Sequence, residues 1–123
     1  MTLVSRTLDP TTVRSLAEHE AIGGGAGLAV ARRYTAADIV EEIDAAGLRG
    51  RGGSGFPTST KLRTVAASGS DRVATTVVVN AAEGEPGTFK DRALLRTNPY
   101  RVLEGAIIAA LAVGAGDIKV GIK

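Results

Sequence analysis

The sequence predicts an α/β protein with a parallel sheet and flanking helices. An apolar run over residues 73–79, with three consecutive valines, has the length and composition of a strand buried on both faces. A second short apolar run follows at residues 118–122, and a helical pattern over residues 99–113 lies between the two. The order strand, helix, strand is typical of a βαβ unit, in which the two strands run parallel.

The first half of the chain predicts helices and loops. Residues 12–21 show a weak helical pattern, which the glycine-rich stretch 23–27 interrupts. A clearer helix begins after Thr35, because Asp38 follows three residues later as in a capping box. Gly47 is a natural C-terminal stop for this helix.

The second half carries stronger signals. Thr58 could cap a short helix over residues 59–66, and a further short helix is expected over residues 91–96. Asn98 followed by Pro99 is a strong start signal for the long helix. Two strands alone make a poor sheet. Either the N-terminal part supplies further strands, or the chain belongs to something larger.

Composition sets limits on function. The 123 residues are about one domain's worth, with 44% hydrophobic and 23% charged residues. The chain has no cysteine, which excludes disulfides, thiolate catalysis and cysteine-ligated metal sites within it, and its one histidine, His19, argues against a histidine-based metal site or catalytic triad. No segment resembles a signal peptide, and the longest apolar run, residues 106–113, is too short to span a bilayer. We expect a soluble, intracellular chain.

Charge is distributed unevenly. Residues 1–44 carry four basic and seven acidic side chains, for a net charge of −3, whereas residues 45–123 carry eleven basic and six acidic ones, for a net charge of +5. The basic cluster begins with Arg49, Arg51, Lys61 and Arg63 and suits an anionic ligand, although a solvated charged face is the plainer interpretation. Nucleic acid fits less well, because the chain has only four aromatic residues for stacking.

The first candidate site is the loop of residues 47–58, GLRGRGGSGFPT. Gly50, Gly52 and Gly55 match G-x-G-x-x-G, but a helix precedes them where the dinucleotide fingerprint needs a strand, so that match is rejected. Glycine-rich backbone can still bring N–H groups onto a phosphate or pyrophosphate. The alternative is a plain glycine-rich connector. The neighbouring Arg49, Arg51 and Lys61 favour a nucleotide.

The second candidate site is the loop that follows the valine-rich strand. Open α/β sheets bind their ligands at the carboxyl ends of strands. This loop supplies Asn80, Glu83 and Glu85, followed by Phe89 and Lys90. The amide could bond the polar edge of a heterocycle, and the carboxylates could accept from a ribose or a carboxamide. The alternative is that both glutamates are exposed loop charges. General acid–base catalysis is unsupported, because no histidine accompanies them.

These motifs resemble a known family. GLRGRGGSGFPT with Lys61, then VVVNAAEGEPGTFKDR (residues 77–92) and NPYRVLEG (residues 98–105), resemble the FMN- and NADH-binding flavoprotein subunit of respiratory complex I, NADH:quinone oxidoreductase. The related flavin subunits of NAD-linked hydrogenases and formate dehydrogenases share the pattern. The resemblance runs from about Arg33 to the C-terminus. It implies the N-terminal portion of a Rossmann-like FMN-binding domain, with residues 1–34 as a partly helical extension and residues 35–123 as part of the FMN- and NADH-binding domain.

The resemblance also implies a function and a set of cofactor-binding residues. It implies an NADH dehydrogenase that transfers a hydride from NADH to FMN and passes electrons to iron–sulfur clusters and finally to quinone. It assigns no catalytic residue and no metal ligand in this chain. Gly50, Arg51, Gly52, Gly53 and Gly55 would form the nucleotide-binding loop and Phe56 would pack on the dinucleotide. Lys61 and Asn80 would contact FMN, and Glu83 and Glu85 would face the nicotinamide.

The chain departs from the family in three ways. The usual Asn-Ala-Asp-Glu is Asn80-Ala81-Ala82-Glu83, so a carboxylate expected near the flavin is missing, and Leu62 replaces a common aromatic residue. Family members are several times longer, and their iron–sulfur cluster lies in the part that this chain lacks. A nucleotide-binding or assembly module without catalysis is the alternative. Expected partners are NADH and other subunits of the redox complex, with a cytoplasmic location, peripheral attachment to the plasma membrane through partner subunits, and no direct membrane insertion.

Overall fold

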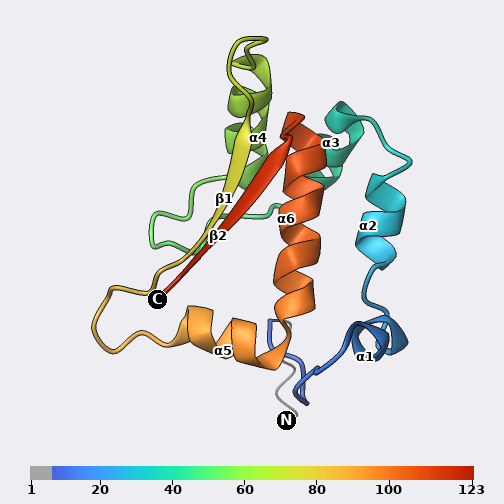
Figure 1. Cartoon of the computed structure of the whole chain (residues 1–123). Coiled ribbons are helices and arrows are strands. Elements are labelled where there is room, and N and C mark those ends of the chain that lie inside the picture. The colour runs from blue at the N-terminus through green and yellow to red at the C-terminus, as the bar shows by residue number, and fades with distance from the viewer. Residues whose placement is uncertain (1–6) are drawn as a thin grey trace.

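The computed structural model describes residues 7–123 as six helices and two strands. In chain order these are α1 (Leu16–Ala21), α2 (Ala26–Ala31), α3 (Ala36–Ala45), α4 (Thr58–Ala67), β1 (Thr76–Ala81), α5 (Lys90–Thr97), α6 (Pro99–Val113) and β2 (Asp117–Ile122). The long helix α6 stands between the strand pair on one side and α2 on the other, with α5 across its lower end (Figure 1).

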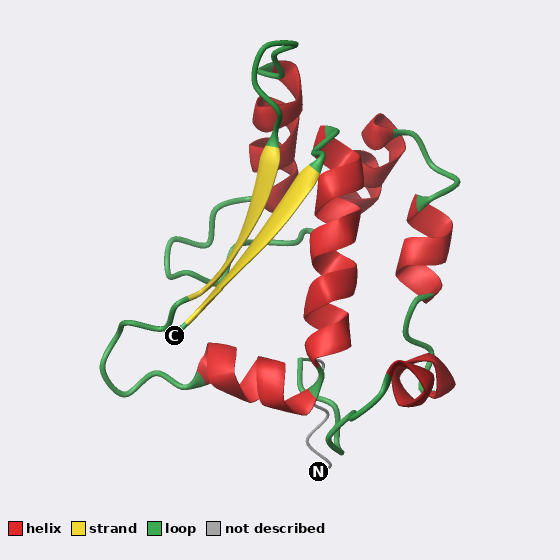
Figure 2. Ribbon diagram, viewed as in Figure 1, coloured by secondary structure: helices red, strands yellow, loops and turns green. Residues whose placement is uncertain are grey.

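The two strands form the predicted parallel βαβ unit. β1 pairs with β2 in parallel, from Thr76 opposite Asp117 to Ala81 opposite Ile122, and the chain between them forms α5 and α6 (Figure 2). This confirms the predicted α/β class with a parallel sheet. The isolated pair is the whole sheet within residues 7–123.

The prediction that the valine-rich strand is buried on both faces is wrong. β1 starts at Thr76, while Val73 lies before it, 71% exposed, in an isolated bridge with Ser70. Within β1, Val77 and Val79 are half-buried but Val78 is 65% exposed. The strand therefore has one covered face and one open face. A sheet of two strands, packed on one side only, leaves every second side chain exposed.

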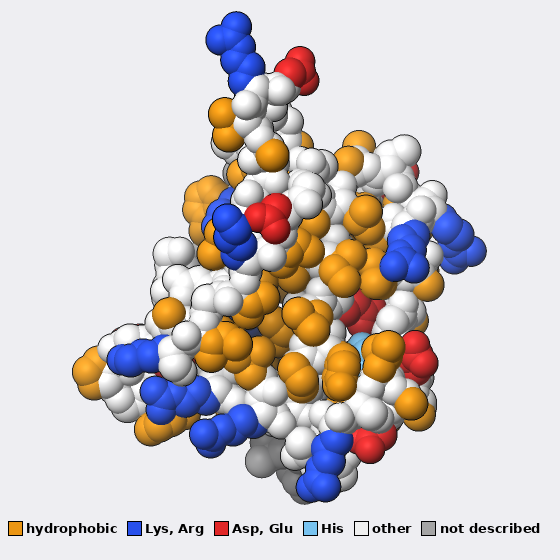
Figure 3. Space-filling model, viewed as in Figure 1, with side chains coloured by type: hydrophobic (Ala, Val, Ile, Leu, Met, Phe, Trp, Pro, Cys, Tyr) orange, Lys and Arg blue, Asp and Glu red, His pale blue; other side chains and the backbone are white. Residues whose placement is uncertain are grey.

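The helix α6 and the strand β2 expose further apolar side chains. Leu103, Ile107 and Leu111 are exposed at helical spacing along α6, and Ile122 is exposed on β2. Hydrophobic side chains gather over the centre of the face that Figure 3 shows.

The core lies on the other side of α6. It consists of Ala31, Ile39, Val40 and Ala112, with partly buried apolar side chains from α3, α4 and α6 packed around it. Ala112 is fully buried. The alanines on this face let α2, α3 and α4 approach α6 closely.

Several helix boundaries follow from local signals. Thr35 and Asp38 form the predicted capping box, with the Thr35 Oγ1 accepting from the Asp38 N–H at 3.2 Å and the Asp38 carboxylate accepting from the Thr35 N–H at 2.9 Å. Asn98 caps α6 by accepting from the Arg101 N–H at 3.2 Å. Thr58, in contrast, is not a cap: it is the first residue of α4, and Pro57 precedes it without a side-chain bond.

The helix α2 was not expected, because residues 23–27 are so rich in glycine. It begins after Gly25, whose φ is +83° and which has no capping side chain. Glu104 on α6 replaces the cap, since its carboxylate accepts from the N–H groups of Gly25 and Leu28, both at 3.0 Å. A carboxylate far away in the sequence thus supplies what the local sequence lacks.

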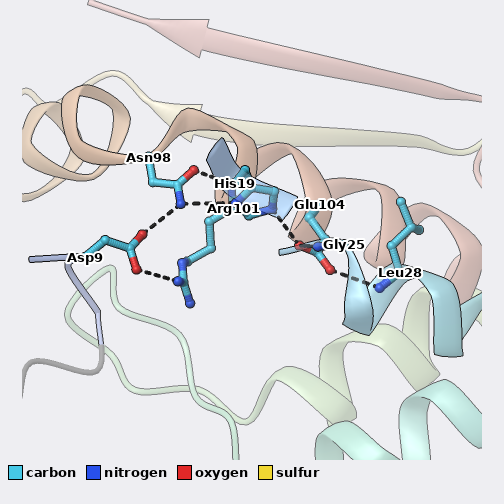
Figure 4. A network of polar contacts seen from close by, with 7 residues as sticks. All are labelled: Asp9, His19, Gly25, Leu28, Asn98, Arg101 and Glu104. Carbon is cyan, nitrogen blue, oxygen red and sulfur yellow. Dashed lines mark hydrogen bonds and ion pairs between the residues drawn. The ribbon is translucent and has the colours of Figure 1, made fainter. Parts of the chain in front are cut away.

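The same carboxylate holds α1. His19 is buried, and its Nε2 lies 3.1 Å from Glu104 Oε2 while its Nδ1 lies 3.2 Å from the Asn98 Nδ2 (Figure 4). Because the Asn98 amide nitrogen donates to Nδ1, the ring proton belongs on Nε2, from which it is donated to Glu104. The Tyr100 ring stacks on His19 with the centroids 5.9 Å apart.

Asp9 completes this polar cluster. Its carboxylate accepts from the Asn98 side-chain amide at 2.7 Å and from the Arg101 guanidinium at 2.6 Å (Figure 4). Residues 7–34 are therefore attached to α6 by several charge-assisted hydrogen bonds. The division of the chain after residue 34 stays a prediction.

Gly24→Ala is expected to destabilise the fold. A Cβ at position 24 would lie 2.2–2.3 Å from three ring atoms of His19, and the ring cannot retreat because Tyr100 and Glu104 hold it. We expect a loss of about 1–3 kcal/mol, measured by urea unfolding. Gly105→Ala is the control: a Cβ there meets nothing within 4 Å, so this variant should be neutral or slightly more stable.

Glu104 should make the stability of the fold depend on acid. Burial acts to raise the pKa of Glu104, but hydrogen bonds from Gly25, Leu28 and His19 outweigh it and hold the pKa below its usual value. The stabilisation is therefore complete above the ordinary glutamate pKa of about 4.3 and is lost as the pH falls through the lower folded-state pKa. Glu104→Gln should be less stable at pH 7 and should lose less stability than the wild type on acidification. An unchanged acid dependence in urea titrations would contradict this assignment.

Candidate functional site

The glycine-rich loop connects α3 to α4, and its two ends lie next to each other. The Gly50 N–H donates to the Phe56 carbonyl at 2.8 Å and the Thr58 N–H donates to the Leu48 carbonyl at 3.0 Å, so the two ends form a short antiparallel bridge. Gly53 and Gly55 have φ values of +107° and +62°, which side chains rarely adopt. The element before this loop is the helix α3. The dinucleotide fingerprint needs a strand at that place, so the structure agrees with the rejection of that match.

Polar contacts fix the base of this loop. Ser59, which is buried at the start of α4, donates to Asp44 Oδ1 on α3 at 2.6 Å, and Arg63 donates to Asp44 Oδ2 at 3.1 Å. These bonds hold the pKa of Asp44 below its usual value: the Ser59 hydrogen bond is the largest single cause, and Arg63 adds both a hydrogen bond and its positive charge. Arg49 donates to the Gly55 carbonyl at 3.0 Å, so it supports the loop and is less available to a ligand.

The tip of the loop carries unused hydrogen-bond donors. Within residues 7–123, the main-chain N–H groups of residues 51–55 donate no hydrogen bond. In the same part of the chain, the exposed cations Arg51 and Lys61 form no ion pair. Free amides on glycine-rich backbone next to two cations are suited to binding a phosphate.

The second loop follows β1 and leads into α5. The Asn80 Oδ1 accepts from the Ala82 N–H at 3.1 Å, which turns the chain at the strand end. Glu83 is 6% exposed and its Oε1 accepts from the Asp91 N–H at 3.2 Å, in the first turn of α5. The alternative of an exposed loop charge therefore fails for Glu83, whereas Glu85 is exposed.

The two loops meet at a cavity of about 340 Å³ at the carboxyl end of β1. It is lined by Gly52, Asn80, Ala82, Glu83, Gly84, Glu85, Thr88, Lys90 and Asp91. Four of the predicted site residues thus line this cavity: Gly52, Asn80, Glu83 and Glu85. The other six do not line this cavity: Gly50, Arg51, Gly53, Gly55, Phe56 and Lys61.

Lys90 also lines the cavity, and the sequence predicted no role for it. Its Nζ lies 2.9 Å from both carboxylate oxygens of Asp91. The pKa of Lys90 is raised, chiefly by the hydrogen bond with Asp91 and further by the charges of Asp91, Glu83 and Glu85, against the opposing effect of burial. The available sequence signal was the position of Lys90 at the start of a short helix directly after the acidic loop.

One oxygen of the cavity has no hydrogen bond. Within the described chain, Glu83 Oε2 is the one buried side-chain oxygen or nitrogen without a hydrogen-bond partner. Its nearest countercharge is the Arg92 Nε, 3.9 Å away. Leaving a buried carboxylate oxygen unbonded is costly, so a donor supplied by a ligand would be stabilised there. Acceptors in one loop and amide donors in the other fit a ligand with both a phosphate and a hydrogen-bonding ring, as FMN has.

The fold and the cavity define the class of protein: an α/β protein whose parallel βαβ unit carries a ligand-sized cavity at the carboxyl end of a strand. The Nuo51 FMN-binding domain family matches residues 43–123. The chain therefore belongs to the Nuo51 FMN-binding domain family, which confirms the resemblance drawn from the two loops.

Relatives agree with this assignment. The chain is 41% identical over 120 residues to an NADH-quinone oxidoreductase subunit of Rhizobium meliloti (strain 1021), covering 96% of this chain and 28% of that protein. It is 36% identical over 121 residues to the corresponding NADH-quinone oxidoreductase subunit of Aquifex aeolicus (strain VF5), covering 98% of this chain and 28% of that protein. The chain thus spans little more than a quarter of the length of these two relatives.

A solved structure is also similar. The crystal structure of an NAD+-reducing [NiFe]-hydrogenase in its H2-reduced state superposes with a TM-score of 0.65 at 45% identity, over 71% of this chain and 15% of that one. This likeness confirms the predicted Rossmann-like α/β fragment. The same fold therefore occurs in an NAD+-reducing hydrogenase.

Ser59→Ala should raise the pKa of Asp44 towards the usual aspartate value, because the Ser59 hydrogen bond is the largest single cause of the shift. Arg63→Gln should raise the same pKa, because it removes both the guanidinium hydrogen bond and the positive charge. The measurement is an NMR titration of the Asp44 carboxyl carbon in each variant. An unchanged Asp44 pKa in the serine variant would show that the buried hydroxyl does not stabilise this carboxylate.

Proposed function

We propose that the chain is part of the flavin subunit of an NADH dehydrogenase of the complex I type. In this proposal it binds FMN and NADH, a hydride passes from NADH to FMN, and electrons continue to iron–sulfur clusters and finally to quinone. The observation that carries the proposal is the cavity in which Gly52 of the glycine-rich loop meets the acidic loop, within a domain of an FMN-binding family. Both nucleotides must reach one place for hydride transfer.

The glycine-rich loop is proposed to hold the phosphate-bearing part of the cofactors. Gly50, Gly52, Gly53 and Gly55 let the backbone approach an anion without a Cβ in the way. Arg51 beside them is exposed and without an ion pair in the described residues, so it can turn towards a phosphate. Electrostatic attraction and the unused N–H groups act together here.

Lys61 and Asn80 are proposed to contact FMN from two sides. Lys61 projects from α4, whose N-terminus follows the loop, and is suited to the FMN phosphate. Asn80 lines the cavity; its Oδ1 is used by Ala82, which leaves its amide N–H groups for a ring carbonyl. The flavin supplies the ability to accept a hydride and to release electrons singly.

Three residues are proposed for NADH. Phe56 is 52% exposed beside the loop, so its ring is available to stack on the dinucleotide. Glu83 and Glu85 line the cavity and would accept hydrogen bonds from the nicotinamide side of the nucleotide. Glu83 offers the unbonded Oε2, and Glu85 is free to adjust because it is exposed.

The partners and location follow from the same proposal. The chain has no cysteine, so the iron–sulfur clusters would be held elsewhere in the assembly, together with other subunits. No helix within residues 7–123 combines the length and the apolar character that crossing a bilayer requires. We propose a cytoplasmic location, with attachment to the inner face of the plasma membrane through partner subunits.

Two alternatives have specific support. The hydrogenase structure favours a flavin subunit of an NAD-linked hydrogenase or formate dehydrogenase, in which the electron acceptor differs. Ala82, which lines the cavity where the family usually has a carboxylate, favours a nucleotide-binding or assembly module without catalysis. Binding of both nucleotides without flavin reduction by NADH would support the module.

The experiment is a spectroscopic titration of the purified protein. Added FMN should be retained through gel filtration, with its absorbance bands shifted, and NADH should bleach these bands under anaerobic conditions. Failure to retain FMN, or retained FMN that NADH never reduces, would overturn the proposed hydride transfer.

Glu85→Gln should weaken NADH binding while leaving the FMN content largely intact, because a carboxylate on the nicotinamide side does not hold the flavin. We expect a loss of NADH affinity of about tenfold, the value of one charge-assisted hydrogen bond. FMN absorbance after gel filtration and an NADH titration measure the two effects separately. Equal loss of both ligands would contradict this role for Glu85.

A further inference from the structure

Two groups lie next to the buried carboxylate of Glu83: the Asp91 N–H and the Arg92 guanidinium. Its side chain is 2% exposed, and one oxygen accepts from the first turn of α5 while the other lies 3.9 Å from the Arg92 Nε. A carboxylate removed from water needs a countercharge or hydrogen bonds to stay ionised without large cost. Arg92 is the cation that forms this ion pair, and at 3.9 Å it makes no hydrogen bond with the oxygen.

Arg92 is 42% exposed and also contacts an aromatic ring. Its guanidinium lies 5.7 Å from the centre of the Phe89 ring, in a cation–π arrangement. Phe89 and Arg92 stand on either side of the start of α5, so the ring and the carboxylate constrain the same guanidinium. Arg92 does not line the cavity, whereas Glu83 does. Arg92 therefore reaches Glu83 from outside the space that a ligand would fill.

We propose that Arg92 is a positioning residue for Glu83: it holds the buried carboxylate in its orientation, with Oε2 available to NADH. This inference rests on the proposed function, because it assigns Glu83 to NADH binding. Arg92 neutralises the charge of Glu83 without using the lone pairs of Oε2 in a hydrogen bond. The site thus keeps an acceptor that is both charged and vacant for a donor of the ligand.

The same helix offers a matched control. Arg96 lies one turn further along α5, is exposed, and forms no ion pair within residues 7–123. If Arg92 served only as a solvated basic residue of α5, replacing either arginine would have the same effect. The two substitutions therefore separate a general charge effect from an effect through Glu83.

The test is a set of NADH titrations on the FMN-loaded protein. Arg92→Gln should weaken NADH binding about tenfold, with FMN content unchanged, whereas Arg92→Lys should retain most of the affinity and Arg96→Gln all of it. In a Glu83→Gln background, Arg92→Gln should have no further effect, because the group through which it acts is gone. Urea unfolding of each variant checks that the fold persists.

Clear outcomes overturn the inference. Equal effects of Arg92→Gln and Arg96→Gln, or additive effects of Arg92→Gln and Glu83→Gln, would show that Arg92 does not act through Glu83. If Arg92→Gln fails to fold, Phe89→Leu takes its place: it should lower NADH affinity about threefold in the wild-type background and not in Glu83→Gln. A wild-type protein that binds FMN but not NADH overturns the NADH proposal and this inference with it.

Discussion

The packing of every other element against α6 is the constraint on which this structure depends. Ala106, Ala110 and Ala112 occupy buried positions on this helix, and small side chains allow the backbones of neighbouring helices to come close. The same choice limits the apolar area that each contact removes from water, because alanine has little surface to bury. A core built in this way is thin, and its apolar contacts alone hold the peripheral helices weakly.

Polar contacts compensate at two places. Glu104 on α6 caps α2 and bonds His19 of α1, so one carboxylate attaches two short helices that have few apolar contacts of their own. Ser59 and Asp44 join α3 to α4 at the base of the glycine-rich loop. The loop between them can remain free of internal hydrogen bonds at its tip because its two ends are fixed. Rigidity at the base and unused donors at the tip are what a phosphate-binding loop needs.

The sequence predicted best what local chemistry decides. The capping box at Thr35, the Asn98-Pro99 start and the parallel βαβ order depend on neighbouring residues, and the structure confirms them.

The helix α2 was missed because its N-terminus is satisfied by Glu104, which is 79 residues from Gly25. The exposure of Val78 was missed because apolar composition reports the capacity of a strand for burial and says nothing of how many layers cover it. Strand-end reasoning placed Asn80, Glu83 and Glu85 together, yet only tertiary structure distinguishes the buried carboxylate from the exposed one.

The two loops offer complementary groups to a ligand. The glycine-rich loop offers donors and positive charge, which suit a phosphate, and the acidic loop offers acceptors, which suit the N–H groups of a ring or a carboxamide. A nucleotide whose phosphate and ring differ in just this way satisfies both loops at once, whereas an isolated anion would leave Glu83 unbonded and be repelled by it. In the proposed function, the carboxylates of the acidic loop would repel an additional phosphate near the ring, and Ala82 stands where the family usually has a further carboxylate. The cavity keeps the carboxylates of Glu83, Glu85 and Asp91 beside the cation Lys90. Of these carboxylates, Glu83 is the one with a buried oxygen that has no hydrogen bond, so the way Glu83 is held decides which donor a ligand must bring.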